Sequence, residues 1–278
     1  MARFSASKIK LWMSCPLKAH FRYDLKLPTE KGAKAVYGSA VHSALDVFHR
    51  TNDEAQAKAR FIDFWENPEG FGETIDYWET GITFPKAKAN GLELIEWYAS
   101  RSSWNPSKLI CSERKFLVPF GEHELTGYVD FVEWTNSKDG KRLEVVDLKT
   151  GYRPPQYALR SDIQFTVYVY ATMQPEFWLG NGPHFPPLPD GERLWEEFGT
   201  SALRRPVWYD LNNKRRYDCG PRTDEDFMRL YRIVKEIDNA QKKEVWVPKI
   251  SHDSCGFCDY ADPCGLKIQP EEDMEEAL

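Results

Sequence analysis

The sequence predicts an α/β (α+β) domain in which helices come first, an antiparallel meander of strands follows, and a helix and a further strand come after it. Apolar residues at helical spacing mark the first hundred residues, whereas alternating segments rich in Val, Phe, Leu, Tyr and Trp mark residues 113–149. With 278 residues, 41% of them hydrophobic, the chain can bury one large core. We therefore expect a single domain.

The first helix is expected to begin at Ser5 or Ser7, because a serine side chain caps a helix N-terminus well. Pro16 disfavours helical backbone at the preceding residue, so Cys15 should lie at a helix end or turn. A second helix is expected over residues 38–50, where apolar residues are spaced for one face. Further helices are expected over residues 53–66, 86–101, 161–173 and 223–241.

Three strands are expected over residues 113–120, 124–134 and 142–149, and the polar residues 136–140 signal the turn between the last two. A fourth strand is expected near residues 206–211. Residues 174–206 hold six prolines and four glycines, which predicts a loop-rich insertion.

The formal net charge of −6 does not suggest a nucleic-acid partner. Five acids fall within residues 271–276, however, so the rest of the chain is close to neutral and can still bind DNA through local patches. The pair Arg204-Arg205 and the run Lys214-Arg215-Arg216 are candidates, although such clusters are more often ordinary solvated surface. Charge alone does not decide the function.

Neither a membrane span nor a signal peptide is apparent. No apolar run is long enough to cross a bilayer, and the N-terminus lacks the apolar stretch and cleavage site of a secretory signal. We expect a soluble, cytoplasmic protein that does not associate with membranes.

A carboxylate and a lysine two residues apart end the third expected strand. On a strand, Asp147 and Lys149 point to the same face, about 6.6 Å apart along the backbone. The chain contains four acid-x-Lys tripeptides, and only this one ends an apolar strand, where a charged pair is costly to bury without a purpose. A short hairpin could bring Asp130 beside Asp147, and a bound cation would relieve the repulsion between them. A structural Asp–Lys pair is the alternative.

Two further polar elements flank this pair. Gln164 and Tyr168 are neighbours on one face of the next helix, where both can donate hydrogen bonds, although a core helix with a polar edge fits as well. His42 lies beside the apolar stripe of the second helix, after Gly38-Ser39-Ala40, whose small side chains would let that helix approach the sheet closely.

The order Gly-x-x-x-His, Gly-x-x-Asp, Asp-x-Lys-Thr-Gly and Gln-x-x-x-Tyr resembles the RecB-like branch of the PD-(D/E)XK nuclease superfamily. The resemblance implies a restriction-endonuclease-like core with a central mixed sheet flanked by helices. It implies that His42, Asp130 and Asp147 are metal ligands, that Lys149 is the catalytic lysine and that Gln164 and Tyr168 support it. In the same resemblance, Glu113 corresponds to a further family acid. The namesake proline is absent, since Val129 precedes Asp130, but this branch commonly shows Gly-x-x-Asp.

The C-terminal segment contains Cys255, Cys258 and Cys264, a spacing that suits a shared metal centre. Cys15 is the best candidate for a fourth ligand, and His252 is the local rival, which would give zinc. Cys111 and Cys219 have no cysteine neighbours and are expected to be plain buried thiols.

The iron–sulfur subgroup of the same branch, which includes AddB-type helicase–nucleases and CRISPR-associated RecB-like exonucleases, has one cysteine before the nuclease motifs and three after them. The resemblance therefore implies a 4Fe-4S cluster held by all four cysteines, with structural zinc as the alternative. It also implies a single nuclease domain over residues 1–268, with cluster-binding segments at 1–30 and 245–268. Residues 269–278 would be an acidic, disordered tail.

The function expected from these features is Mn²⁺- or Mg²⁺-dependent hydrolysis of DNA at its ends, with single strands preferred. A histidine ligand favours Mn²⁺. Recombination or CRISPR-adaptation proteins are the partners that the resemblance suggests. Two alternatives stay open: a DNA-binding or assembly module without activity, and a structure- or sequence-specific endonuclease.

Overall fold

A computed structural model describes residues 1–138, 140–199, 202–251, 255 and 258–265. The expected tail at 269–278 and the rival ligand His252 lie outside these residues. The N-terminal helical part comprises β1 (Arg3–Phe4), α1 (Ala6–Ser14), α2 (Pro16–Ala19), a π-helical turn (His20–Asp24), α3 (Ala33–Thr51), α4 (Glu54–Glu66) and α5 (Phe84–Ser100). The remaining elements are β2 (Leu109–Phe120), β3 (His123–Ser137), β4 (Gly140–Lys149), α6 (Gln156–Arg160), α7 (Ile163–Thr172), α8 (Pro175–Leu179), α9 (Gly191–Phe198), β5 (Leu203–Asp210), β6 (Arg215–Asp218), α10 (Asp224–Lys242) and α12 (Ala261–Cys264).

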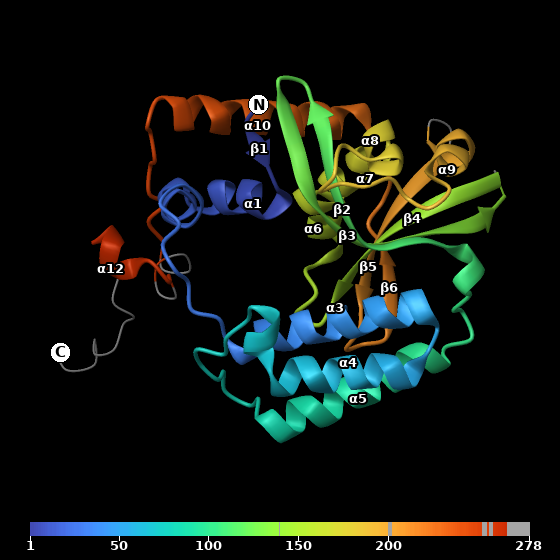
Figure 1. The fold of residues 1–278 in the computed structure, drawn as a ribbon. Helices are drawn as coiled ribbons and strands as arrows, with labels where there is room; N and C mark the ends of the chain where they lie inside the picture. The colour runs from blue at the N-terminus through green and yellow to red at the C-terminus, as the bar shows by residue number, and fades with distance from the viewer. Residues whose placement is uncertain (139, 200–201, 252–254, 256–257, 266–278) are drawn as a thin grey trace.

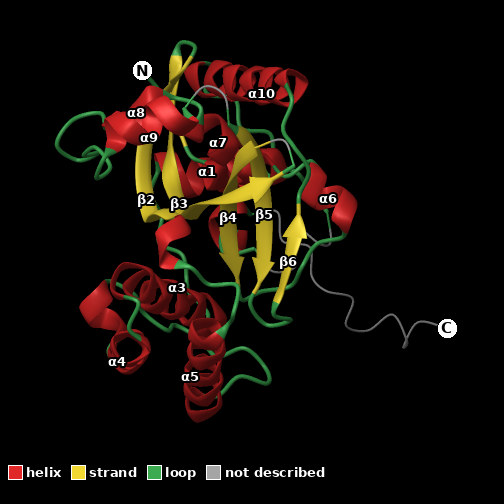
Figure 2. Cartoon of the chain, turned by 90° about the vertical axis from the view of Figure 1, so that its right-hand side faces the viewer, coloured by secondary structure: helices red, strands yellow, loops and turns green. Residues whose placement is uncertain are grey.

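Within the described residues, six strands form one mixed sheet with the order β1-β3-β4-β5-β6, and β2 pairs with the opposite edge of β3 from β1. The pairs β2–β3, β3–β4 and β5–β6 are antiparallel, whereas β1–β3 and β4–β5 are parallel. The parallel step from β4 to β5 needs a long crossover, which α6 to α9 provide. This architecture confirms the predicted fold class (Figure 2).

Helices cover both faces of the sheet (Figure 1). One buried cluster joins α1, α7, α8, α9 and α10 to β2 and β3, and it is centred on side chains such as Phe116 and Val167. A second cluster packs α3, α4 and α5 against the other face, where Phe131, Val146 and Val207 are buried. The two faces therefore meet different helical layers, and β3 contributes to both.

The predicted boundaries hold well at the helix starts. Ser5 caps α1 by accepting a hydrogen bond from the backbone N–H of Lys8 at 3.2 Å, and Cys15 ends that helix. The helix predicted over 38–50 begins five residues earlier, at Ala33. The segment 174–206, expected to be rich in loops, contains α8 and α9, because Phe177, Trp178 and other apolar side chains are buried against the sheet.

The short strand β6 and helix α6 were not predicted, since neither has an apolar pattern long enough to mark it. Among the described residues, no helix is long and apolar enough to cross a membrane.

Candidate active site

Three carboxylates lie in one row across β2, β3 and β4. Phe131 on β3 pairs with one residue on β2 and with one on β4. Glu113 directly follows the partner on β2, and Asp147 directly follows the partner on β4. Because both pairs are antiparallel, Glu113 and Asp147 lie opposite Asp130, which directly precedes Phe131. The hairpin therefore brings Asp130 and Asp147 together as the sequence predicts. Glu113 completes the row from the other side.

His42 on α3 projects toward this row from the opposite layer. One ligand atom from each of His42, Glu113 and Asp130 lies within 4.8 Å of the other two. The imidazole Nδ1 lies 3.5 Å from Glu113 Oε1 and 3.7 Å from Asp130 Oδ2, whereas Nε2 donates a hydrogen bond to the carbonyl oxygen of Leu148 at 3.0 Å. Nδ1 is thus aimed at the two carboxylates.

The close approach of α3 to the sheet depends on small residues, as expected. A Cβ atom placed on Gly38 would lie 3.2 Å from Oγ1 of Thr150, which leaves little room for a side chain. Ala40 is completely buried on the same helix. Larger residues here would move His42 away from the carboxylates.

The backbone of Glu113 is strained. Its φ of +43° lies in the left-handed region, which is costly for a residue with a β-carbon. The residues on both sides of Glu113 pair regularly with β3, so the unusual backbone conformation at Glu113 changes the direction of its side chain. Such strain is typical of functional positions, and here the carboxylate points at His42.

The charges of the cluster shift the titration of its members. Burial lowers the pKa of His42, but the carboxylates of Asp130 and Glu113 outweigh this effect and raise that pKa to about 9. Burial also raises the pKa of Asp130, which the charges of His42 and Lys149 oppose. The carboxylates of Asp130 and Glu113 lie close together around the imidazole of His42. A divalent cation that takes nitrogen and oxygen ligands would neutralise their negative charge, so these three side chains fit such an ion.

Asp147 is not among the three clustered ligands, because its carboxylate faces Lys149 and Gln164. Lys149 Nζ donates to Asp147 Oδ1 at 2.9 Å, and Gln164 Nε2 donates to the same oxygen at 2.8 Å. Gln164 also donates to the hydroxyl of Tyr168 at 2.9 Å. The predicted supporting pair thus holds Asp147, which in turn holds Lys149.

The pKa shifts in this group follow from burial. Burial and the charge of Asp130 raise the pKa of Asp147 to about 6, against the opposing charge of Lys149. Burial lowers the pKa of Lys149, but Asp147 and Asp130 outweigh it and raise that pKa, so the ammonium stays charged. Burial raises the pKa of Tyr168, which keeps its hydroxyl protonated.

Two hollows flank the row of carboxylates. One, of about 750 Å³, runs along α3 and is lined by His42 and Glu113, and the other, of about 700 Å³, runs along α1 and is lined by Asp130, Gln164 and Tyr168. Tyr128 borders both hollows. Its side chain is 51% exposed, and it lies two residues before Asp130 on β3, hence on the same face.

The predicted basic patches have different roles. Arg204 is buried and donates to backbone carbonyls, including that of Phe198 at 3.0 Å. Arg205 pairs with Asp218, and Arg216 forms ion pairs with the carboxylates of β3 and β4. Arg204 and Arg216 therefore stabilise the fold and are not a free DNA-binding patch, whereas Arg205 and Asp218 form a partly exposed surface pair. Lys214 has no such partner among the described residues.

The four cysteines at the two ends of the chain line one cavity. Cys15, Cys255, Cys258 and Cys264 surround about 220 Å³, together with apolar side chains such as Phe21. Each of the four is partly exposed. Cys15 therefore lines the same cavity as the three C-terminal cysteines, and their sharing of one metal centre stays a prediction.

Two contacts fasten the ends around this cavity. The hydroxyl of Tyr260 donates to the carbonyl oxygen of Leu27 at 3.1 Å, and Lys18 pairs with Asp259 at 3.0 Å. Figure 1 shows α12 beside the segment that follows α1. The remaining cysteines, at 111 and 219, are buried away from it, and burial raises the pKa of each thiol to about 12.

A mixed sheet between two helical layers, with a histidine and acids meeting at its centre, defines a candidate metal-dependent hydrolase. The model of the PD-(D/E)XK nuclease superfamily matches residues 3–265, and the chain belongs to this superfamily. The superfamily implies a metal-dependent nuclease acting on DNA. No curated protein matches the sequence. A solved structure described as "Crystal structure of SSO0001" is 10% identical, with a TM-score of 0.41 over 97% of this chain and 89% of that chain.

Proposed function

We propose that this protein is a Mn²⁺- or Mg²⁺-dependent exonuclease of the RecB-like type that hydrolyses single-stranded DNA from its ends. The observation that carries the nuclease proposal is the meeting of His42, Glu113 and Asp130 within 4.8 Å beside the Asp147–Lys149 pair. His42, Glu113 and Asp130 would hold the cation, whereas Asp147, the third ligand predicted from the sequence, would position Lys149. Preference for ends follows from the family resemblance.

When bound, the cation activates water and stabilises charge on the phosphate. The residues of the chain prepare the site for this chemistry. The Nε2–H of His42 is fixed by Leu148, so Nδ1 keeps its direction. Lys149, held by Asp147, offers a charged donor for a phosphate oxygen. Gln164 fixes Asp147 and thereby the position of Lys149.

Tyr128 supports the preference for single strands. An exposed aromatic ring beside the carboxylates offers a stacking surface for one base, and stacking needs a base that is not covered by its neighbours in a duplex. The hollows on either side give the strand room to pass the cluster.

We further propose that the four-cysteine cavity holds a 4Fe-4S cluster. Four thiolates suit either such a cluster or one Zn²⁺ ion. The resemblance to the iron–sulfur subgroup is what favours the cluster over a single zinc ion. The group would act as a staple between the first helices and the last segment.

The proposed activity is tested with two single-stranded substrates of the same sequence, one linear and end-labelled and one covalently closed. With Mn²⁺, the purified protein should degrade the linear DNA and leave the circle intact, and Asp147→Ala should cleave neither. Cleavage of the circle would favour an endonuclease. Binding without cleavage of either substrate would favour a module without activity.

A further inference from the structure

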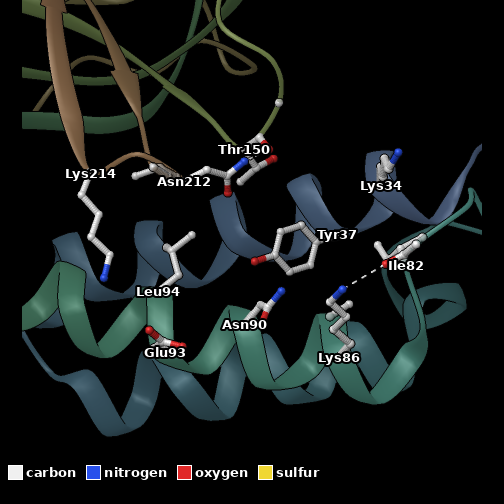
Figure 3. A pocket seen from close by; sticks show the side chains of 14 residues that line it. Lys34, Tyr37, Ile82, Lys86, Asn90, Glu93, Leu94, Thr150, Asn212 and Lys214 are labelled. Carbon is white, nitrogen blue, oxygen red and sulfur yellow. Dashed lines mark hydrogen bonds between the residues drawn. The ribbon is translucent and has the colours of Figure 1, made fainter.

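A second hollow adjoins the candidate active site at the far end of α3. It measures about 490 Å³ and lies between α3, α5 and the turn that joins β5 to β6 (Figure 3). Lys34 comes from α3, Lys86 from α5 and Lys214 from the turn. The ligand set of the carboxylate cluster does not include any of these residues. We call this hollow the lysine pocket.

The three ammonium groups of the lysine pocket have no carboxylate partner among the described residues. Lys86 makes one weak contact, with the carbonyl oxygen of Gly81 at 3.4 Å. Lys214 lies 5.2 Å from the ring centroid of Trp97, which holds its stem over α5. Glu93 is the one acidic residue in the lining, so the pocket is net positive.

Neutral donors lie among the lysines. Tyr37 packs edge-on against two aromatic rings of α4, and its hydroxyl faces the pocket in Figure 3. Burial raises the pKa of Tyr37 to about 12, so the hydroxyl remains a donor. Asn90 adds an amide on α5. Ammonium, hydroxyl and amide donors around one hollow are the groups that bind phosphate oxygens.

The lysine pocket is continuous with the hollow beside His42, because Lys34 and Thr150 line both. Thr150 directly follows Lys149 in the chain. Asn212 donates to the carbonyl oxygen of Thr150 at 2.5 Å, and Leu211 N–H donates to that of Lys149 at 2.9 Å. These bonds fix the turn that carries Lys214 to the strand end that carries the catalytic lysine.

We propose that the lysine pocket is a subsite that binds a backbone phosphate of the DNA strand several nucleotides from the bond that is cut. This inference rests on the proposed nuclease function and adds the path of the strand: past Tyr128, across the carboxylates and over Lys34 into the pocket. The subsite would give longer substrates tighter binding. The subsite would bind the DNA through the charge of its phosphate and would confer no sequence preference.

The test compares fluorescent oligo(dT) of 3 and 15 nucleotides in binding to the full-length protein, with Ca²⁺ as the divalent cation and at several salt concentrations. The variant combines Lys34→Ala, Lys86→Ala and Lys214→Ala, three exposed positions. A matched control removes three other exposed lysines that form no ion pair within the described part of the chain, Lys138→Ala, Lys235→Ala and Lys243→Ala. A third protein carries arginine at the three pocket positions.

The pocket variant should bind the 15-mer about tenfold or more weakly, with a salt dependence shallower by about 0.7, since each phosphate contact on a single strand contributes about 0.7. The 3-mer should bind all proteins equally, and arginine should restore the 15-mer. Equal 15-mer binding by the pocket and control variants would overturn the subsite. Equal weakening of 3-mer and 15-mer binding in the pocket variant would place the pocket at the cleavage site and overturn the strand path.

Wild-type cleavage of linear DNA is measured in parallel on the same protein preparations, with Mn²⁺ in place of Ca²⁺. If the wild type cleaves and binds the 15-mer but the pocket variant behaves like the control, the subsite is wrong and the nuclease proposal stands. If the wild type neither binds nor cleaves, both are wrong.

Discussion

The imidazole of His42 donates its Nε2–H to the carbonyl oxygen of Leu148 at 3.0 Å, across the interface between α3 and the sheet. Leu148 N–H in turn donates to Asp130 at 2.6 Å. One peptide segment of β4 therefore orients two ligands of the proposed cation site. An outer contact of this kind fixes the tautomer and the direction of a histidine ligand.

Replacing His42 by alanine should weaken Mn²⁺ binding by about 100-fold, because a directed nitrogen ligand is lost while the neighbouring acids remain. Isothermal titration calorimetry measures the affinity. His184→Ala is the matched control, since His184 is exposed and lies in the loop between α8 and α9. Unchanged Mn²⁺ affinity in His42→Ala would remove this residue from the site.

Lys149→Ala should retain the fold and bound cation but reduce the cleavage rate constant by about 10² to 10³, the usual cost of losing one donor to transition-state charge. Single-turnover cleavage of saturating DNA measures this rate. Lys141→Ala removes an exposed lysine of the same strand and should leave the rate unchanged. Normal turnover by Lys149→Ala would exclude the ammonium from the chemistry.

Tyr128→Ala should raise the KM for single-stranded DNA about tenfold, because stacking one base on an aromatic ring contributes about 1–3 kcal/mol. Tyr128→Phe keeps the ring and should behave like the wild type. Tyr157, whose side chain is 77% exposed on α6, provides the control Tyr157→Ala. Equal KM values for Tyr128→Ala and Tyr128→Phe would contradict base stacking.

The stability of the protein should fall in mild acid because of His49. Burial, with the charge of Arg101, lowers its pKa to about 3, and the ring is held neutral between Ser112 at 3.0 Å and Tyr98 at 2.7 Å. The unfolded chain binds a proton at His49 below pH about 6.5, whereas the folded state does not, so stability declines as pH falls from about 6.5 toward 3.

Between pH 7 and pH 5 this residue should cost about 2 kcal/mol of unfolding free energy. Urea titrations at both pH values measure the loss in the wild type and in His49→Gln. The wild type should lose about 2 kcal/mol more than the variant, since the opposing effect of Asp147, whose raised pKa favours low pH, is common to both proteins. Parallel losses would show that His49 does not titrate on unfolding.

Cys15→Ala should abolish the broad visible absorption of an iron–sulfur cluster and lower the melting temperature of anaerobically purified protein. Cys111→Ala, which changes a buried thiol outside the cavity, should keep the absorption. Iron and sulfide analysis accompanies the spectra. Stoichiometric zinc without iron in the wild type would replace the cluster by a structural zinc ion.

The order of helices and strands was predictable because period-2 and period-3.6 apolar patterns mark long elements clearly. The site was predictable in part. Glu113 belongs to the clustered ligands, although the motif resemblance placed it only at the margin. Its position follows from the tight β2–β3 turn: Phe120 pairs with His123, and counting back along both strands sets Glu113 opposite Asp130. The β2–β3 turn therefore predicts the position of Glu113 opposite Asp130, which the motif alone does not.

Other features depend on tertiary contacts that no local pattern encodes. Tyr128 and Lys34 become candidate binding residues only because they line the hollows that form where α1 and α3 meet the sheet. Asp147 looked like a ligand equal to Asp130, but the amide of Gln164 and the ammonium of Lys149 occupy its carboxylate. Competition between partners in three dimensions decides such details.

The contacts of Lys18 with Asp259 and of Leu27 with Tyr260 join segments that lie far apart in the sequence. During translation, Cys15 emerges long before its three companions and cannot share a centre with them. Assembly of any cluster must therefore wait until the sheet has been completed. A chain that stopped before Cys255 would lack this closure.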